Sequence, residues 1–267
     1  MEQDTNMKNH HHLLRQKLNS RARFIYNTHL EPHIWQPDGQ MNKLVSNSLQ
    51  MIIWSYIAYM QSIGFPIADT DVHEIFVHGS LTNYYYDDTS DIDICIVADL
   101  GRMQSLFTGC NINALIKGAL GSWKRNYDIR VCDRGIDIEV VDVATPRYGD
   151  NVYKVGSAYS LPRDQWIRRP IQLKSDEVKQ IRRDAREQFK EIKKLYKQVR
   201  RNKMSAEFIE TFLGRMSTER KESYAQNPLQ PVTSTTMAFR MARRCGMLRK
   251  LRQMATELRS HEFNLKL

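Results

Sequence analysis

Two aspartates stand inside an otherwise apolar segment of the chain. The stretch "HGSLTNYYYDDTSDIDICIV" covers residues 78–97 and places Asp91 and Asp93 among isoleucines and a valine, with no basic residue beside them. On a strand, positions i and i+2 point to the same face, so the two carboxylates share one face and Ile92 and Ile94 point to the other. Adjacent carboxylates repel each other unless a cation lies between them. The pattern therefore predicts a cation site, and Mg²⁺ fits it because this ion prefers oxygen ligands.

A glycine and a serine shortly before this strand indicate an anion site. Gly79 allows the backbone to approach a ligand closely, and Ser80 offers a hydroxyl and an N–H group. Together they could hold the terminal phosphates of a nucleotide triphosphate. A metal-bridged triphosphate beside an acceptor hydroxyl is the arrangement of two-metal phosphoryl or nucleotidyl transfer.

The combined motif resembles a known enzyme superfamily. Gly79-Ser80, ten intervening residues and then Asp91-x-Asp93 resemble the signature of the polymerase beta-like nucleotidyltransferases. The stretch "IFVHGSLTNYYYDDTSDIDICIVAD" is most similar to predicted nucleotidyltransferases of tailed bacteriophages, as are "YDIRVCDRGIDIEVVD", "GSAYSLPRDQWIRRP" and "AFRMARRCGMLRKL". The resemblance touches most of the chain from about residue 42, and only the Gly-Ser and Asp-x-Asp part is specific for chemistry. It implies an enzyme that uses Mg²⁺ or Mn²⁺ and takes an NTP as substrate.

The superfamily also carries a third carboxylate on a later strand. The segment "GIDIEVV" offers Asp137 and Glu139, which share one strand face between apolar residues. The spacing from Gly135 resembles the phage group better for Glu139, which we prefer, with Asp137 as the alternative. The resemblance implies that this residue ligates a metal together with Asp91 and Asp93 and helps to deprotonate the acceptor hydroxyl.

Several residues near the motif receive a structural interpretation. His78 is expected to be a packed residue at a strand end, and Tyr84–Tyr86 an aromatic loop that could also stack on a base. Three basic residues are expected on a solvated helix face from which they could reach a triphosphate: Lys117, Lys124 and Arg125. A second Gly-Ser pair, Gly156-Ser157, is expected to have no chemical role because no Asp-x-Asp follows it.

The positive charge of the chain is concentrated in its last third. The 267 residues carry a net charge of +10, and residues 171–267 hold 23 Lys and Arg against 11 Asp and Glu, a net +12. Residues 1–170 hold 17 against 19, a net −2. Such asymmetry favours a polyanionic partner, although solvated helix faces would give the same count. We expect RNA as the acceptor, for example one with a tRNA-like 3′ end, bound through the basic C-terminal helices.

Hydrophobic periodicity predicts an α+β fold with three parts. These are a polar N-terminal extension over residues 1–40, a catalytic domain over 41–170 with a small mixed sheet flanked by helices, and a basic all-helical domain over 171–267. Helices are expected over 41–63, 111–123, 175–201 and 206–225 and from 234 onward, the last with a break at Gly246. Strands are expected over 74–79, 91–97, 127–133 and 136–143, with a turn at 133–135.

Composition and motif content argue against other classes. No apolar run is long enough to span a bilayer, and the polar N-terminus is neither a signal nor a transit peptide. Four widely spaced cysteines indicate reduced thiols in a cytoplasmic setting, which the phage resemblance places in a bacterial host. The common phosphate-loop, zinc-protease and nucleophile-elbow motifs are missing. Two alternatives remain: nucleotidylation of a protein or small molecule, and a catalytically silent nucleic-acid-binding protein.

Overall fold

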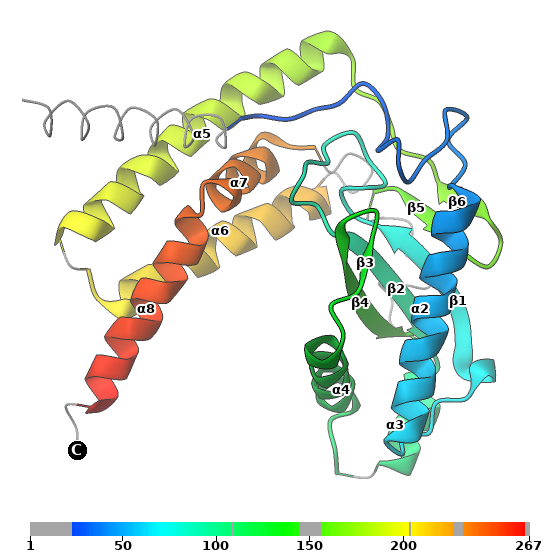
Figure 1. Cartoon of the computed structure of the whole chain (residues 1–267). Helices are drawn as coiled ribbons and strands as arrows, with labels where there is room; N and C mark the ends of the chain where they lie inside the picture. Colours follow the sequence, from blue (N-terminus) through cyan, green and yellow to red (C-terminus); the bar gives the residue numbers. More distant parts are fainter. Residues whose placement is uncertain (1–22, 108, 145–155, 203, 227–231, 265–267) are drawn as a thin grey trace, which may run out of the picture. The chain divides into compact units, whose positions relative to one another are not determined.

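The computed structural model describes residues 23–107, 109–144, 156–202, 204–226 and 232–264. The described residues divide into two compact units, one within 26–172 and the other from Leu173 onward together with 23–25 (Figure 1). The first unit is α+β with a mixed six-stranded sheet, and the second is helical in its described part. Residues 1–22 of the expected extension lie outside the described residues.

The sheet has the strand order β3-β4-β2-β1-β5-β6. Its strands are β1 (Val72–His78), β2 (Ile92–Ala98), β3 (Arg130–Val131), β4 (Arg134–Asp142), β5 (Ala158–Ser160) and β6 (Gln165–Arg168). β2 and β4 run parallel, and the other neighbouring pairs are antiparallel. The two strands that the sequence analysis assigns to the carboxylates, β2 and β4, are therefore neighbours at the centre of the sheet.

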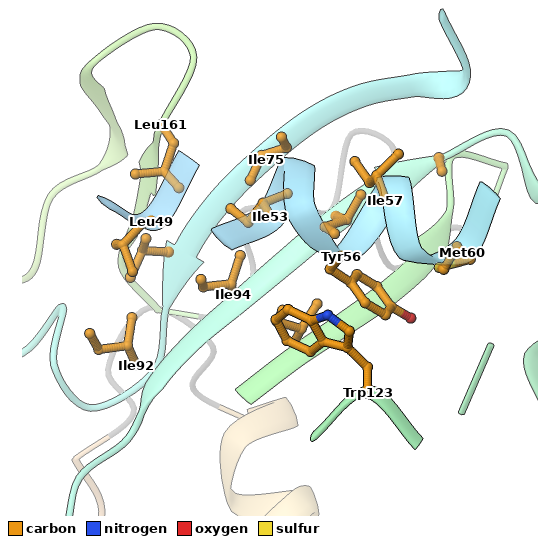
Figure 2. Close-up of a cluster of buried hydrophobic side chains, with 14 of the residues drawn as sticks. Leu49, Ile53, Tyr56, Ile57, Met60, Ile75, Ile92, Ile94, Trp123 and Leu161 are labelled. Atoms are coloured by element: carbon orange, nitrogen blue, oxygen red, sulfur yellow. The ribbon is translucent and has the colours of Figure 1, made fainter. Parts of the chain in front are cut away.

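One face of this sheet is covered by helices and forms the larger core; Phe76, Cys95, Val97 and Ala158 form a smaller cluster on the other face. The helices of this unit are α2 (Lys43–Ser62), α3 (Leu100–Leu106) and α4 (Ile112–Asn126). α2 begins at Asn42, whose side chain accepts a hydrogen bond from the Leu44 N–H at 3.0 Å, and it is followed by Gly64 with φ +85°. Figure 2 shows the apolar stripe of α2 facing strand residues and Trp123 of α4: Leu49, Ile53, Tyr56, Ile57 and Met60 against Ile75, Ile92 and Ile94.

The segment just before α2 belongs to the sheet unit. Trp35 is 3% exposed, donates its indole N–H to the carbonyl of Leu81 at 2.7 Å and stacks on Trp166 of β6 with ring centroids 4.5 Å apart. Ile34 is buried in the same core. The sheet unit therefore starts near residue 26 and not at 41, because these apolar side chains need its core.

The second unit contains four described helices, and their limits agree with the expected periodicity. They are α5 (Ser175–Asn202), α6 (Ala206–Gln226), α7 (Ser234–Arg244) and α8 (Met247–Asn264). α5 packs on α7, and α6 packs on α7 and α8. The predicted break at Gly246 is confirmed: its φ is +69°, and its N–H donates to the carbonyl of Arg243 at 2.9 Å. None of the described helices is both long and apolar enough to cross a membrane.

The region around the third carboxylate strand differs from the expectation in two details. The β3–β4 turn consists of Cys132 and Asp133, with φ of 50° and 59°, so β4 already begins at Arg134. Two successive left-handed residues are the geometry of a two-residue hairpin turn, which the expected turn at 133–135 misplaced by one residue. β3 is also much shorter than the apolar alternation of 127–133 suggested. Neither α3 nor the β5–β6 hairpin was expected.

Candidate active site

Strand register brings the predicted carboxylates onto one face of the sheet. Asp93 pairs with His78 of β1 on one side and with Asp137 of the parallel strand β4 on the other. Directly paired residues point to the same face of a sheet, about 4.8 Å apart from strand to strand. Glu139 pairs with Cys95, two residues further along β2, and lies on this face too. This face is the one opposite to the α2 core.

The two halves of the motif are in direct contact. Gly79 follows β1 with φ +84°, and a Cβ atom built on it would lie 1.9 Å from Oδ2 of Asp93. The Asp93 carboxylate thus occupies the space that any side chain at position 79 would fill. Asp91, just before β2, lies in the same way against Gly135: a Cβ there would come within 3.0 Å of its Oδ1. Each aspartate of the Asp-x-Asp pair rests beside a glycine of a neighbouring strand end.

A buried polar network supports the loop that follows Gly79. The carbonyl of Gly79 accepts hydrogen bonds from Oγ1 of Thr82 at 3.0 Å and from Nδ2 of Asn83 at 2.9 Å. Ser157 donates its hydroxyl to the carbonyl of Thr82 at 2.6 Å and accepts from Nδ2 of Asn83 at 2.6 Å. Ser80, only 7% exposed, lies in the same loop. Buried polar groups that satisfy one another in this way fix one loop conformation.

Ser157 therefore has a role that sequence reasoning missed. Its Gly-Ser pair was set aside because no Asp-x-Asp follows it, yet the side chain lies directly under the first Gly-Ser loop and is 2% exposed. The contact joins residues more than 70 positions apart, so no local pattern could have indicated it.

His78 and Lys124 each contact one of the two candidates for the third carboxylate. Nε2 of His78 lies 3.4 Å from Oε1 of Glu139, and the two side chains are 22% and 45% exposed. Nζ of Lys124, in the last turn of α4, lies 2.5 Å from Oδ1 of Asp137. His78 is thus part of the carboxylate face, whereas the sequence suggested only a packed strand end. Lys117 and Arg125 are exposed on α4.

An arginine clamp holds the segment that leads into Asp91. Nη2 of Arg134, at the start of β4, lies 3.6 Å from Oε1 of the buried Glu31. Nη1 of Arg134 donates to the carbonyls of Asp87 and Ser90. Because Arg134 is only 14% exposed at its side chain, these contacts are shielded from water. The clamp ties the loop before β2 to the start of β4.

The tyrosine triplet splits between core and surface. Tyr85 is 4% exposed, whereas Tyr84 and Tyr86 line a hollow of about 760 Å³ together with Trp35 and Trp166. Burial raises the pKa of Tyr86, the nearby Glu31 raises it further, and Arg134 opposes them. The expected, partly buried aromatic loop is confirmed, and stacking on a base stays a prediction.

The carboxylates of this face suit a hard divalent cation, although their side chains are not close enough together to form a metal site. Across the described segments, no group of three His, Cys, Asp or Glu side chains is close enough to hold a metal ion. The carboxylates of one sheet face are nevertheless all oxygen donors, the ligands that Mg²⁺ and Mn²⁺ prefer. The residues present therefore fit such an ion by their chemistry. Comparison with models of protein families, with curated proteins and with solved structures finds no match for this chain.

Proposed function

We propose that this protein is a polymerase beta-like nucleotidyltransferase that transfers a nucleoside monophosphate from an NTP to an acceptor hydroxyl and releases pyrophosphate. The observation that carries the proposal is the contact between Gly79 and Asp93, because it joins the phosphate-side and metal-side halves of the motif. The carboxylates on the same face of β2 and β4, opposite the α2 core, add to it. RNA is the proposed acceptor, on the basis of the net charge of +12 in residues 171–267.

Each motif residue has a stated task in this proposal. Asp91, Asp93 and Glu139 would hold Mg²⁺ or Mn²⁺, and the bound ions would supply positive charge to the triphosphate. The backbone at Gly79 and Ser80 would bind the terminal phosphates. The carboxylate of Glu139 would take the proton of the acceptor hydroxyl as its oxygen bonds to the α-phosphorus. The bond from that phosphorus to the bridging oxygen then breaks, and pyrophosphate leaves with the electron pair.

Glu139 is the better choice for the third carboxylate because of what its neighbours are. Asp137 already has a lysine ammonium at 2.5 Å, which neutralises it. Glu139 contacts the imidazole of His78, which carries charge only when protonated. Under this assignment Glu139→Gln should abolish transfer, whereas Asp137→Asn should lower it by less than about tenfold. If Asp137→Asn abolished transfer and Glu139→Gln only lowered it, Asp137 would be the third carboxylate.

The deciding experiment is a transfer assay. Wild-type protein is incubated with Mg²⁺ or Mn²⁺, each α-labelled NTP in turn, and total bacterial RNA. The Asp91→Ala/Asp93→Ala variant is assayed in parallel. The matched control is Asp69→Ala/Asp128→Ala, which removes two exposed aspartates outside the motif. We expect label on RNA with wild type and control, and a loss of at least about 1,000-fold in the motif variant.

The same assay separates the alternatives. Label on protein or on a small molecule, with none on RNA, would favour nucleotidylation of those acceptors. Equal label in wild type and in the motif variant would refute the proposed chemistry. A silent nucleic-acid-binding protein predicts no turnover with any acceptor, unchanged RNA binding in the motif variant, and a higher melting temperature once the repelling aspartates are removed.

A further inference from the structure

Helix α5 carries most of its apolar, basic and acidic residues on three separate faces, with Leu195 and Lys194 as exceptions on the acidic side. Apolar residues form the first face: Val178, Ile181, Ala185, Phe189, Ile192, Tyr196 and Val199. Seven basic residues form the second, here named the basic rail: Lys179, Arg183, Arg186, Lys190, Lys193, Lys197 and Arg200. The third face contains the acidic residues Glu177, Asp184, Glu187 and Glu191. At about 100° per residue, alternating spacings of four and three keep the rail along one side of the helix.

The rail is exposed over its whole length. All seven side chains are exposed, and the spacing from Lys179 to Arg200 corresponds to about 30 Å along the helix axis. Lys179 and Lys190 pair with Asp176 and Glu187 at 3.1 and 2.7 Å, and exposed pairs of this kind contribute little and exchange easily. Within the described part of the chain, no ion pair is seen for Arg183, Arg186, Lys193 or Lys197.

This separation of charge is not what solubility alone would require. A helix that only needs a solvated surface gains most from mixing the two signs, because Glu and Lys at i and i+4 support each other. On α5 the rail places like charges three and four residues apart over six turns, where each such pair is destabilising. A partner with regularly spaced negative charges would offset that repulsion.

The burial of the apolar and aromatic residues of α5 argues against a membrane and against a single strand, and favours a nucleic-acid duplex as the partner. An amphipathic helix binds a membrane through its apolar face, but here that face is packed in the helical unit: Ala185 and Val199 are 0% exposed. Single-stranded nucleic acid is usually held by aromatic side chains on which bases stack. The aromatic residues of α5, Phe189 and Tyr196, are both buried, so the rail offers charge without stacking surfaces.

We infer that the basic rail of α5 binds the phosphate backbone of double-stranded RNA. The inference rests on the proposed function only for the choice of RNA. A straight row of seven cations over about 30 Å matches the regularly repeated negative charge of the phosphates along a duplex. Contacts of this kind would hold the protein on its substrate without distinguishing one base sequence from another. In this arrangement the sheet unit carries the chemistry, and α5 retains a structured acceptor such as the stem next to a free 3′ end.

The test compares two variants of equal charge. The rail variant is Arg186→Gln/Lys193→Gln/Lys197→Gln, and the control is Arg249→Gln/Lys250→Gln/Arg252→Gln, three exposed cations of α8. Gln keeps a good helix propensity, and circular dichroism checks that both variants are folded. Binding of an RNA duplex of about 20 base pairs is measured by fluorescence anisotropy over a range of salt concentrations. The same-sequence DNA duplex and single-stranded RNA are measured alongside.

We expect the rail variant to bind the RNA duplex on the order of 100-fold more weakly at physiological salt, with a salt slope lower by about 3, and the control to stay within about threefold of wild type. Equal weakening in both variants would mean that net charge alone attracts RNA, and would overturn the inference. So would tighter binding of the single strand or of the DNA duplex, or the absence of duplex binding at low salt.

The two proposals can fail separately. The Asp91→Ala/Asp93→Ala variant should bind the duplex like wild type, because the motif lies on the sheet unit. If no nucleotide transfer is ever detected but the rail variant still loses duplex binding, the rail stands and the enzyme assignment falls. If transfer occurs and the rail variant binds and labels duplex RNA like wild type, the rail inference is wrong and the enzyme assignment stands.

Discussion

The two faces of strand β2 differ in the residues that they carry near the start of the strand. Ile92, Ile94 and Ile96 point toward α2 and are each 0% exposed. The residues between them include Asp93 and, before the strand, Asp91, which point the other way with side chains that reach solvent. One face is therefore a close-packed core, whereas the other carries the carboxylates at the start of β2 and, further along, the buried Cys95 and Val97, which belong to a smaller apolar cluster.

The contrast shows what a strand needs in order to carry charge. The isoleucines of the apolar face are buried against α2, and the backbone of β2 pairs with β1 and β4. Both interactions hold β2 at the centre of the sheet. The charged face is tolerated because Gly79 leaves room for the Asp93 carboxylate and because Lys124 and His78 lie beside the carboxylates of β4. Fold and candidate chemistry therefore use alternate residues of the same strand.

The largest effect should come from moving charge to the wrong face. Ile94→Asp would bury an unpaired carboxylate at a site with no exposure, so we expect loss of more than about 4 kcal/mol of stability and failure to fold. Ile94→Val, the control, should cost only about 1 kcal/mol. Chemical denaturation followed by circular dichroism gives both values. A folded Ile94→Asp protein would show that this face is not the core.

A smaller effect should come from closing the space next to Asp93. Gly79→Ala and Gly64→Ala both place a side chain at nearly the same positive φ, but a Cβ at Gly64 meets nothing within 4 Å. Gly64→Ala should therefore cost about 1–2 kcal/mol from backbone strain alone. Gly79→Ala should cost about 1 kcal/mol more, because the Asp93 side chain must leave its rotamer.

The double variant Gly79→Ala/Asp93→Ala isolates that contact. With the carboxylate removed, the cost of Gly79→Ala, measured relative to Asp93→Ala alone, should fall to that of Gly64→Ala in wild type. Urea denaturation of the four proteins completes the cycle. An unchanged extra cost in the absence of the Asp93 carboxylate would mean that the glycine is needed for a reason other than close approach.

Much of this arrangement could be predicted from the alternation of residues. Period-two patterns placed Asp91 and Asp93 opposite the isoleucines, and period-three and -four patterns predicted α2, α4 and the C-terminal helices. The fold class α+β with a mixed sheet is confirmed. These patterns could be recognised because each one lies within a single helix or a single strand.

What could not be predicted depends on contacts between distant segments. β5 has only three residues, and it exists because β1 and β6 pair with it. Ser157 acquires its role only when β5 is brought next to the Gly79 loop. The pairing of His78 with Glu139 likewise requires the parallel register of β2 and β4. The spacing from Gly135 favoured Glu139 over Asp137, but the different neighbours of the two side chains, His78 and Lys124, could not be read from it.

A buried carboxylate away from the carboxylate face should respond to pH. Asp71, 5% exposed before β1, accepts hydrogen bonds from the Arg102 guanidinium, with Nε at 2.6 Å, and from the Ala68 N–H at 2.7 Å. The bond to Arg102 holds the pKa of this carboxyl below its ordinary value, against a smaller opposing effect of burial. Asp71→Asn should therefore cost about 1–2 kcal/mol at neutral pH.

The sign of the pH dependence follows from the lowered pKa. The ionised group stabilises the fold above its unfolded pKa, near 4, and this contribution is lost as the pH falls through the folded value. The stability difference between wild type and Asp71→Asn should thus be largest at pH 7 and shrink as the pH falls below about 4. Urea denaturation at several pH values measures it. A difference that stays constant would show that Asp71 acts through its shape and not its charge.

The smallest effect should come from the exposed ion pair at the edge of the carboxylate face. Lys124 and Asp137 are 35% and 66% exposed, so water and salt screen their attraction. Lys124→Met and Asp137→Asn should each change stability by less than about 1 kcal/mol, and a double-mutant cycle should give a coupling that fades at high salt. The functional prediction is sharper, because Lys124→Met would free the Asp137 carboxylate. If Mg²⁺ then protects the variant against thermal unfolding more than it protects wild type, Lys124 keeps Asp137 out of the cation site; equal protection would show that Asp137 takes no part in it.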